Sequence, residues 1–150
     1  MTTLYIAGPM RRRPEFNFPE FLRVDPILVR AGYGTLNPAQ KDLDAGIVVA
    51  GLNGYEEIEG FSIRSVMKVD CDLICDLADG IALLDEWWDS RGARAEVALA
   101  EALGIPVAHW SRWANWGSRS HGYVPQIAAG MEDVMRTPVV HNLAEVKVPS

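Results

Sequence analysis

The stretch that decides the fold is "GIALLDEWWDSRGARAEVALAEALGIPVAHW", Gly80 to Trp110. Its first residues, "GIALLD", form an apolar run without polar alternation, which is typical of a strand buried on both faces. After the loop "EWWDSRG" comes an alanine-rich segment with helical spacing, which Gly104 is expected to end. The strand "IPVAHW" follows. A strand, a helix and a second strand in this order predict parallel pairing.

The preceding part of the chain extends this alternation. Strands are predicted at Thr3 to Ala7 and at "YGTLNP", which ends at Asn37-Pro38. Helices are predicted from about Phe18 to Ala31, with Asn17 as N-cap and a kink at Pro26, and from Ser62 to about Leu77. Residues 39–60, rich in Gly, Asn and Asp, predict a long loop with a short helical or strand piece at "GIVVAG".

The C-terminal part is less regular. The segment "WSRWANWGSRSHGYVPQ" (110–126) predicts an ordered loop whose tryptophans cover the core edge, line an interface or close over a ligand. A last short helix (127–136) and an edge strand (137–143) are expected after it. As a whole the chain predicts an α/β fold, a parallel sheet with helices on both faces, in a single domain spanning residues 1–150.

Composition excludes several classes of protein. The 150 residues are 49% hydrophobic and 23% charged, as in a globular domain, and the net charge of −6 argues against a nucleic-acid-binding protein. We expect no membrane association and a cytoplasmic location, because there is no long apolar run and no signal pattern at the N-terminus. Cys71 and Cys75 are expected to be packing residues, since two thiols are too few for a zinc site.

Glu96 is unusual on its helix. At 100° per residue with Glu96 at zero, Leu103 falls near 340°, Leu99 near 300° and Ala100 near 40°, so the carboxylate shares the apolar stripe. In one interpretation it caps its own helix or pairs with an arginine such as Arg64 or Arg91. In another it points into a ligand site.

The expected position of a ligand favours the second interpretation. Ligands of open parallel sheets bind at the carboxyl ends of the strands, where the loops at 8–18, after Asn37 and at 85–92 gather. No GxGxxG or GxxxxGK[ST] motif is present, which argues against a dinucleotide enzyme and a P-loop NTPase. No Ser–His pairing is predicted, because all three histidines (His109, His121 and His141) fall outside these loops.

Three segments together carry a family resemblance: "YIAGPM" (5–10), "LNPAQ" (36–40) and the stretch from Asp70 to Val107 with "SRGAR-x-E". Over about residues 3–108 the chain resembles the nucleoside 2-deoxyribosyltransferase-like superfamily. It is most similar to a branch common in phages and bacteria and to the 2′-deoxynucleoside 5′-monophosphate N-hydrolases. The resemblance implies a flavodoxin-like (Rossmann-like), doubly wound parallel sheet.

The resemblance also implies roles for individual residues. Glu96 would attack C1′ of a nucleoside or nucleotide, forming a covalent glycosyl-enzyme that water or another base resolves. Asp70, or Asp72 in an alternative register, would protonate the departing base. Tyr5 would orient the nucleophile, although a core aromatic is the alternative. The other residues expected to bind substrate are Gly8, Pro9, Met10, Arg11, Asn37, Ser90, Arg91 and Gly92.

Ser90 points to the substrate class. Related enzymes that act on free nucleosides carry an aspartate six residues before the nucleophile, whereas the nucleotide hydrolases carry serine, which can donate to a phosphate. With Arg91 adjacent and Arg11 to Arg13 in the first loop, we expect a nucleoside 5′-monophosphate as substrate. The three loop arginines could equally be a solvated surface cluster.

The resemblance implies no metal and no organic cofactor. It implies a homodimer or higher homo-oligomer in which the C-terminal region of one subunit completes the neighbour's site, a role that Trp110, Trp113 or Trp116 could serve. The leading hypothesis is thus an N-glycosidase or base-exchanging transferase. The alternatives are a non-catalytic nucleotide-sensing module of the same fold and a purely structural phage protein.

Overall fold

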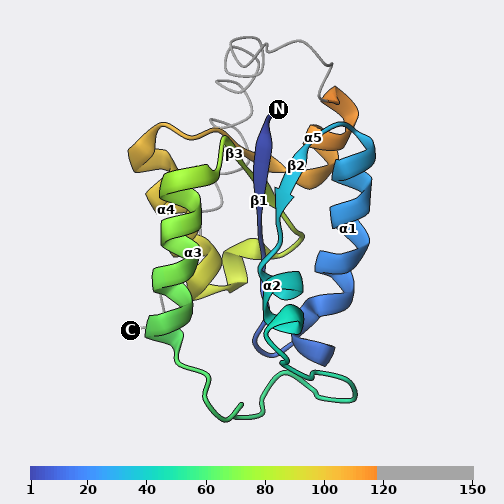
Figure 1. The fold of residues 1–150 in the computed structure, drawn as a ribbon, viewed down its shortest axis with the longest axis vertical. Coiled ribbons are helices and arrows are strands. Elements are labelled where there is room, and N and C mark those ends of the chain that lie inside the picture. Colours follow the sequence, from blue (N-terminus) through green and yellow to red (C-terminus); the bar gives the residue numbers. More distant parts are fainter. Residues whose placement is uncertain (118–150) are drawn as a thin grey trace.

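The computed structural model describes residues 1–117, which form a four-stranded parallel sheet with helices on both faces (Figure 1). The strand order is β2-β1-β3-β4, with pairs such as Leu4 to Thr35 and Tyr5 to Ile81 in register. This order corresponds to the first four strands of the flavodoxin arrangement, and it confirms the predicted fold class. The strands are β1 Thr3–Ala7, β2 Gly34–Leu36, β3 Gly80–Leu83 and β4 Val107–His109.

Four helices and two short 3-10 turns lie between the described strands, and a fifth helix, α5, follows β4. Helices α1 and α5 lie on one side of the sheet, and α3 and α4 lie on the other (Figure 1). Their bounds are η1 Pro14–Asn17, α1 Phe18–Arg30, α2 Pro38–Asp44, α3 Ile63–Leu77, η2 Trp87–Asp89, α4 Arg91–Leu103 and α5 Trp110–Trp116. The helix boundaries predicted for α1 and α3 agree with these to within one residue.

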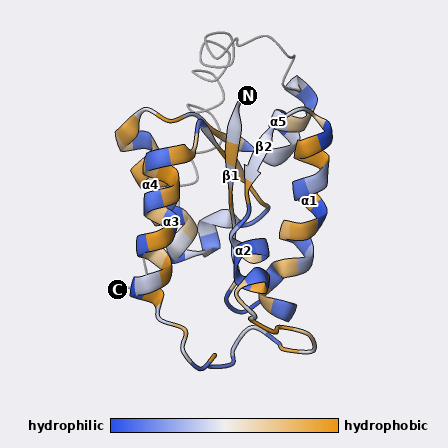
Figure 2. Cartoon of the chain, viewed as in Figure 1, coloured by the Kyte–Doolittle hydropathy of each residue, from blue (hydrophilic) through white to orange (hydrophobic). Residues whose placement is uncertain are grey.

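The alternation of side chains along β1 divides the core into two layers. Leu4 and Ile6 pack with the apolar side chains of α1, whereas Tyr5 and Ala7 pack in the layer beneath α3 and α4. Hydrophobic and hydrophilic residues alternate along these helices (Figure 2), as in helices that bury one face against a sheet. Tyr5 is therefore placed in the same layer as the α4 residue Val97, in the middle of β1 and paired with Leu36 at the end of β2.

Helix α2 corrects the prediction of a long loop beginning at residue 39, because it occupies Pro38–Asp44. Asn37 accepts hydrogen bonds from the backbone N–H groups of Ala39 and Gln40, and Pro38 takes the first helical position. A capping residue followed by proline is a recognised helix start, so the signal was present in the sequence. The piece expected at "GIVVAG" forms neither helix nor strand.

The tryptophan-rich segment begins as helix α5, not as the predicted ordered loop. Trp113 is fully buried and donates its indole N–H to the carbonyl of Ile81, while the Tyr33 hydroxyl donates to the carbonyl of Trp113. Because Trp113 fills the core of its own chain, it does not serve a neighbour's site. The predictions for 127–136 and 137–143, and those on His121 and His141, lie outside the described residues.

The start of α1 differs from expectation. Asn17 precedes the helix in a left-handed conformation, and its side chain donates to the carbonyl of Pro9 without capping the helix. Pro26 lies inside this helix, and the kink expected there stays a prediction. None of the described helices is long and apolar enough to cross a membrane.

Candidate functional site

Glu96 lies on the inner side of α4, at the edge of its buried face. Ala93, Val97 and Ala100 are buried and mark the centre of that face, whereas Leu103 is half exposed. The apolar face that the helical wheel predicts for α4 is therefore rotated slightly from the face that is buried in the structure. Glu96 is nevertheless only 6% exposed, so its carboxyl group lies in a largely apolar layer.

The partner of Glu96 is Tyr5 on β1. The tyrosine hydroxyl donates to Glu96 Oε1 at 2.9 Å, joining residues 91 positions apart in the chain. The alternative in which Glu96 caps its own helix is wrong, because Ser90 Oγ accepts from the Ala93 N–H at that end. Within residues 1–117 Glu96 forms no ion pair, so the pairing with Arg64 or Arg91 is also absent.

Asp70 on α3 is the second buried carboxyl group, with 4% exposure. It pairs with Lys41 of α2, whose Nζ lies 2.5 Å from Asp70 Oδ1. Lys41 was not among the residues predicted from the sequence, because its helix was taken for a loop. Asp72, the alternative acid, is exposed and does not line the cavity described below.

The environment of Glu96 changes its ionisation. Burial raises the pKa of the Glu96 carboxyl to about 8, and the negative charge of Asp70 acts in the same direction. The Tyr5 hydrogen bond and the Lys41 ammonium lower that pKa in part. Burial, together with Glu96 and Asp70, raises the pKa of Tyr5 well above its ordinary value. In the free protein Glu96 is therefore largely protonated at neutral pH, and Tyr5 remains a neutral donor.

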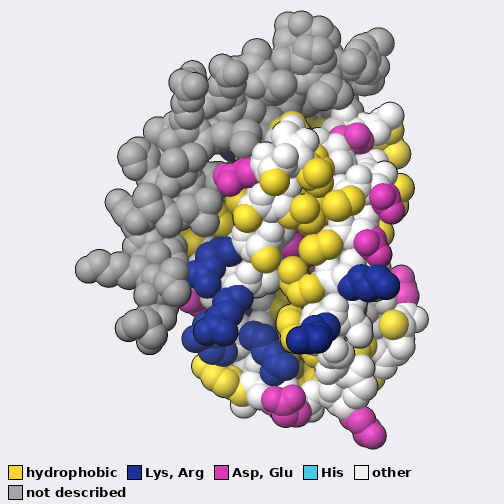
Figure 3. All heavy atoms as spheres, turned by 90° about the vertical axis from the view of Figure 1, so that its left-hand side faces the viewer, with side chains coloured by type: hydrophobic (Ala, Val, Ile, Leu, Met, Phe, Trp, Pro, Cys, Tyr) yellow, Lys and Arg dark blue, Asp and Glu magenta, His cyan; other side chains and the backbone are white. Residues whose placement is uncertain are grey.

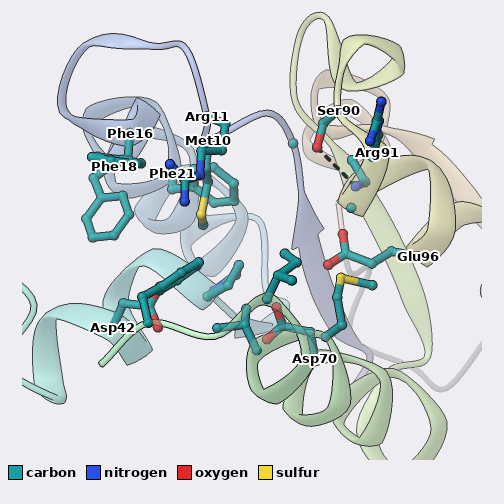
Figure 4. Close-up of a pocket in the computed structure, with 18 of the residues that line it drawn as sticks. Met10, Arg11, Phe16, Phe18, Phe21, Asp42, Asp70, Ser90, Arg91 and Glu96 are labelled. Carbon is teal, nitrogen blue, oxygen red and sulfur yellow. Dashed lines mark hydrogen bonds between the residues drawn. The ribbon is translucent and has the colours of Figure 1, made fainter. Parts of the chain in front are cut away.

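These groups face a cavity of about 620 Å³, a size typical of small-molecule sites. Its wall combines the N-terminal end of α4 with β1, α3, α2 and the loops at 8–18 and 47–61. Figure 4 shows Glu96, Ser90 and Arg91 on one side, and Phe16, Phe18, Phe21 and Asp42 on the other. On the face of the molecule that carries α3 and α4, Lys and Arg side chains gather beside hydrophobic ones (Figure 3).

Comparison of the sequence with known families finds a match. Residues 2–109 match the family described as a domain of unknown function, DUF4406. The chain belongs to this family. The match ends with β4 and includes every residue of the Tyr5–Glu96–Asp70 cluster. No curated protein matches the chain, and no solved structure does.

In this DUF4406 domain the start of α4 forms the edge of the cavity. Ser90, Arg91, Gly92 and Ala93 all line it, and the first-turn N–H groups of a helix favour an anion. The Ser90 oxygen already accepts from Ala93, which leaves its hydroxyl hydrogen able to donate outward. At Gly92 a Cβ atom would make only ordinary contacts with Met67 and Ser90, so the space there does not require glycine.

The first loop of the DUF4406 domain places its three arginines differently. Arg13 pairs with Glu86 at 2.9 Å and with Asp89 at 3.2 Å, which commits it to acidic partners. Arg11 lies over the rings of Phe16 and Phe61, 5.8 Å from each centroid, and donates to the carbonyl of Glu56. Arg12 is exposed and lies 3.9 Å from Asp89.

The other residues expected to bind substrate divide into two groups. Gly8 and Met10 line the cavity, although close packing also explains the glycine, because a Cβ atom there would lie 2.7 Å from Leu84 Cβ. Asn37 and Pro9 do not line it. Asn37 caps α2 and donates to Asp25, and the Pro9 carbonyl accepts from Asn17, so both stabilise the loops around the site.

The prediction that no serine pairs with a histidine is wrong. His109 Nδ1 lies 2.7 Å from Ser111 Oγ and its Nε2 lies 2.6 Å from Asp85 Oδ1. His109 Nδ1 also accepts from the Ser111 N–H, so this contact caps α5. None of the three residues lines the cavity. Within residues 1–117 no group of three metal-ligating side chains is found, and both cysteines are free.

Proposed function

We propose that this protein cleaves the N-glycosidic bond of nucleoside 5′-monophosphates, with Glu96 as the nucleophile. The observation that carries the proposal is the buried Glu96 carboxyl, held by the Tyr5 hydroxyl and adjacent to Asp70 in one cavity. Two carboxyl groups with different environments are the usual equipment for glycoside cleavage. The resemblance to the nucleoside 2-deoxyribosyltransferase-like superfamily supports the same assignment.

The reaction would proceed in two displacements at C1′. In the first, a Glu96 oxygen forms a bond to C1′ while the C1′–N bond breaks, and the base leaves with the electron pair and takes up a proton. In the second, water attacks C1′ and the glycosyl ester breaks, which regenerates the Glu96 carboxylate and releases the sugar phosphate. A second base in place of water would give a transferase.

The raised pKa of Glu96 has a direct consequence for this mechanism. Only the ionised carboxylate is nucleophilic, and in the free protein that form predominates only above about pH 8. The positive charge that develops on the sugar would stabilise the carboxylate during the reaction. Tyr5 supports the same state, because its hydrogen bond favours the ionised form of Glu96.

The departing base requires a proton, which the Lys41–Asp70 pair would deliver. Asp70 faces the cavity, and the Lys41 ammonium contacts the same carboxyl group from behind. Asp70 is paired as a carboxylate, so the proton that the base takes up comes from the Lys41 ammonium by way of the Asp70 carboxyl group, and Lys41 is left neutral until the attacking water releases a proton in the second displacement. At the other end of the ligand, the start of α4 with Ser90 and Arg91 would hold the 5′-phosphate.

The test is direct incubation with each ribonucleoside and 2′-deoxyribonucleoside 5′-monophosphate, followed by chromatography of the free bases. We expect release of at least one base, and no release by the Glu96→Gln variant. Glu101→Gln on the exposed side of the same helix is the control and should retain activity. Absence of base release and of base exchange with every substrate would contradict the proposal.

A second candidate is a nucleotide sensor that binds without turnover. The observation in its favour is the same raised pKa, because a carboxyl group that is largely protonated at neutral pH is a poor nucleophile but a good hydrogen-bond donor. A sensor would bind the monophosphate equally well before and after Glu96→Gln and would release no base. Calorimetry combined with chromatography separates the two functions.

A further inference from the structure

The end of the cavity opposite Glu96 has a composition of its own. Phe16, Phe18 and Phe21 come from η1 and α1, Phe61 comes from the loop before α3, and all four line the cavity. The Arg11 guanidinium lies over two of these rings. Figure 4 places Phe16, Phe18 and Phe21 on the side away from Glu96 and Ser90. Rings and a planar cation are the surfaces on which nucleic-acid bases stack.

Acidic side chains also line this cavity, and Asp42 lies on the same side as Phe16, Phe18 and Phe21 (Figure 4). Asp42 of α2 lines the cavity and is half-buried. Within residues 1–117 its carboxyl group has no hydrogen bond and no ion pair, although Lys41 is its neighbour in the chain, because Lys41 is committed to Asp70. Burial raises the pKa of Asp42, the Lys41 ammonium lowers it in part, and the negative charge of Asp70 raises it further. A half-buried carboxylate without donors is costly unless a ligand supplies them.

The chemistry of a carboxylate restricts which base can supply those donors. An ionised carboxylate only accepts hydrogen bonds, and its two oxygens match two adjacent donors. Guanine presents a ring N–H beside an exocyclic amino group on one edge. Cytosine and adenine present one donor beside an acceptor, and uracil and thymine present one donor between two carbonyls. Facing a carboxylate, each of these bases leaves an acceptor opposed to an oxygen.

We propose that Asp42 selects guanine, so that the ligand of the cavity is a guanosine or 2′-deoxyguanosine 5′-monophosphate. This inference rests on the proposed function for the identity of the ligand as a nucleotide. It adds the base, which stacks against the phenylalanines and Arg11 while its N–H and amino groups donate to Asp42. The sugar then lies toward Glu96 and the phosphate toward Ser90 and Arg91, at the opposite side of the cavity (Figure 4).

The test compares three nucleotides whose purines carry different groups at the 2-position. Calorimetry would measure binding of the 5′-monophosphates of guanosine, inosine and xanthosine, in ribose and 2′-deoxyribose forms, to the intact protein. Inosine lacks the amino group and xanthosine replaces it with a carbonyl. We expect the guanine nucleotide to bind about tenfold or more tightly than the other two, the usual effect of one charge-assisted hydrogen bond.

The variant Asp42→Asn should change this order, because an amide both accepts and donates. It accepts from the ring N–H and donates to a 2-carbonyl, so the xanthine nucleotide should bind more tightly than the guanine nucleotide. The control is Asp44→Asn, which removes the same charge from an exposed position of α2 outside the cavity, and it should leave the order unchanged. Circular dichroism would establish that both variants are folded.

The outcomes separate this inference from the proposed function. Preference for guanine that depends on Asp42, without base release, supports the inference and contradicts the catalytic proposal. Base release without a guanine preference, or with a preference that Asp42→Asn does not alter, overturns the inference alone. Failure of all three nucleotides to bind at millimolar concentration also overturns it.

Discussion

The substitution Glu96→Gln should make the stability of the protein less dependent on pH. Glu96 ionises with a pKa of about 8 in the folded protein, against an ordinary value of 4.5 in the unfolded chain. Below the pKa of the unfolded chain, the carboxyl group is protonated in both the folded and the unfolded state, so its raised pKa in the folded protein does not lower the free energy of unfolding. Between these two values the unfolded chain ionises first, so stability is lost as the pH rises.

The magnitude follows from the difference between the two pKa values. Each unit corresponds to about 1.4 kcal/mol, and integration from pH 5 to pH 9 gives a loss of about 4 kcal/mol from this one group. Glutamine has nearly the same shape, its carbonyl can accept the Tyr5 hydrogen bond, and it does not titrate. The free energy of unfolding of the variant, relative to that of the wild type, should therefore increase by about 4 kcal/mol between pH 5 and pH 9. This is a large share of the stability of a small domain.

The assay is urea unfolding at pH 5, 6, 7, 8 and 9, followed by circular dichroism, with a reducing agent present for the two free cysteines. The quantity of interest is the free energy of unfolding of Glu96→Gln minus that of the wild type, because other titrating groups cancel in the difference. Glu101→Gln, exposed on the same helix, should show a nearly constant difference. A constant difference for Glu96→Gln as well would refute the assignment of a raised pKa.

Three further predictions concern the neighbours of Glu96 and the packing of the first loop. In an active enzyme kcat/KM should rise with pH to a midpoint near 8, and Tyr5→Phe should move that midpoint upward, because Tyr5 lowers the pKa of Glu96; a midpoint that stays in place in the variant would argue against this contact. Lys41→Met leaves the buried Asp70 charge without its partner and should lower the free energy of unfolding in urea by about 3–5 kcal/mol. Lys41→Arg is the conservative comparison, and a decrease below about 1 kcal/mol for Lys41→Met would show that the pair is not formed. Gly8→Ala should destabilise by about 1–3 kcal/mol because its Cβ atom would overlap Leu84, whereas Gly92→Ala, with ordinary contacts, should be nearly neutral; equal effects would contradict the packing described.

The sequence predicted the sheet and the main helices because their signals are local. The apolar run at "GIALL", the spacing around Glu96 and the stop at Gly104 each depend on a few neighbouring residues. Helix α2 was not predicted, although Asn37 and Pro38 mark its start. It is only seven residues long, and the glycine- and asparagine-rich segment that follows it favoured the prediction of a loop. Helix α5 was missed because its stability comes from Trp113 packing in the core, a contact between distant parts of the chain.

The site was predicted only in part for the same reason. The helical wheel placed Glu96 on an inner face, but the hydrogen bond to Tyr5 and the proximity of Asp70 come from strand order and helix packing. Lys41 could not be assigned without α2. The pairing of Arg13 with Glu86 and Asp89 joins two loops that lie far apart in sequence, so no pattern of spacing would reveal that this arginine is already committed.

The central claim is that Glu96 carries the sugar during the reaction, and the most direct test is to look for that covalent intermediate. The protein would be mixed with nucleoside 5′-monophosphates at pH 8, quenched in acid within the first turnover, digested and examined by mass spectrometry. The account predicts a sugar phosphate attached to the peptide that contains Glu96 and its absence from Glu96→Gln. Base release with no adduct on that peptide, or an adduct on Asp70 in its place, would contradict it.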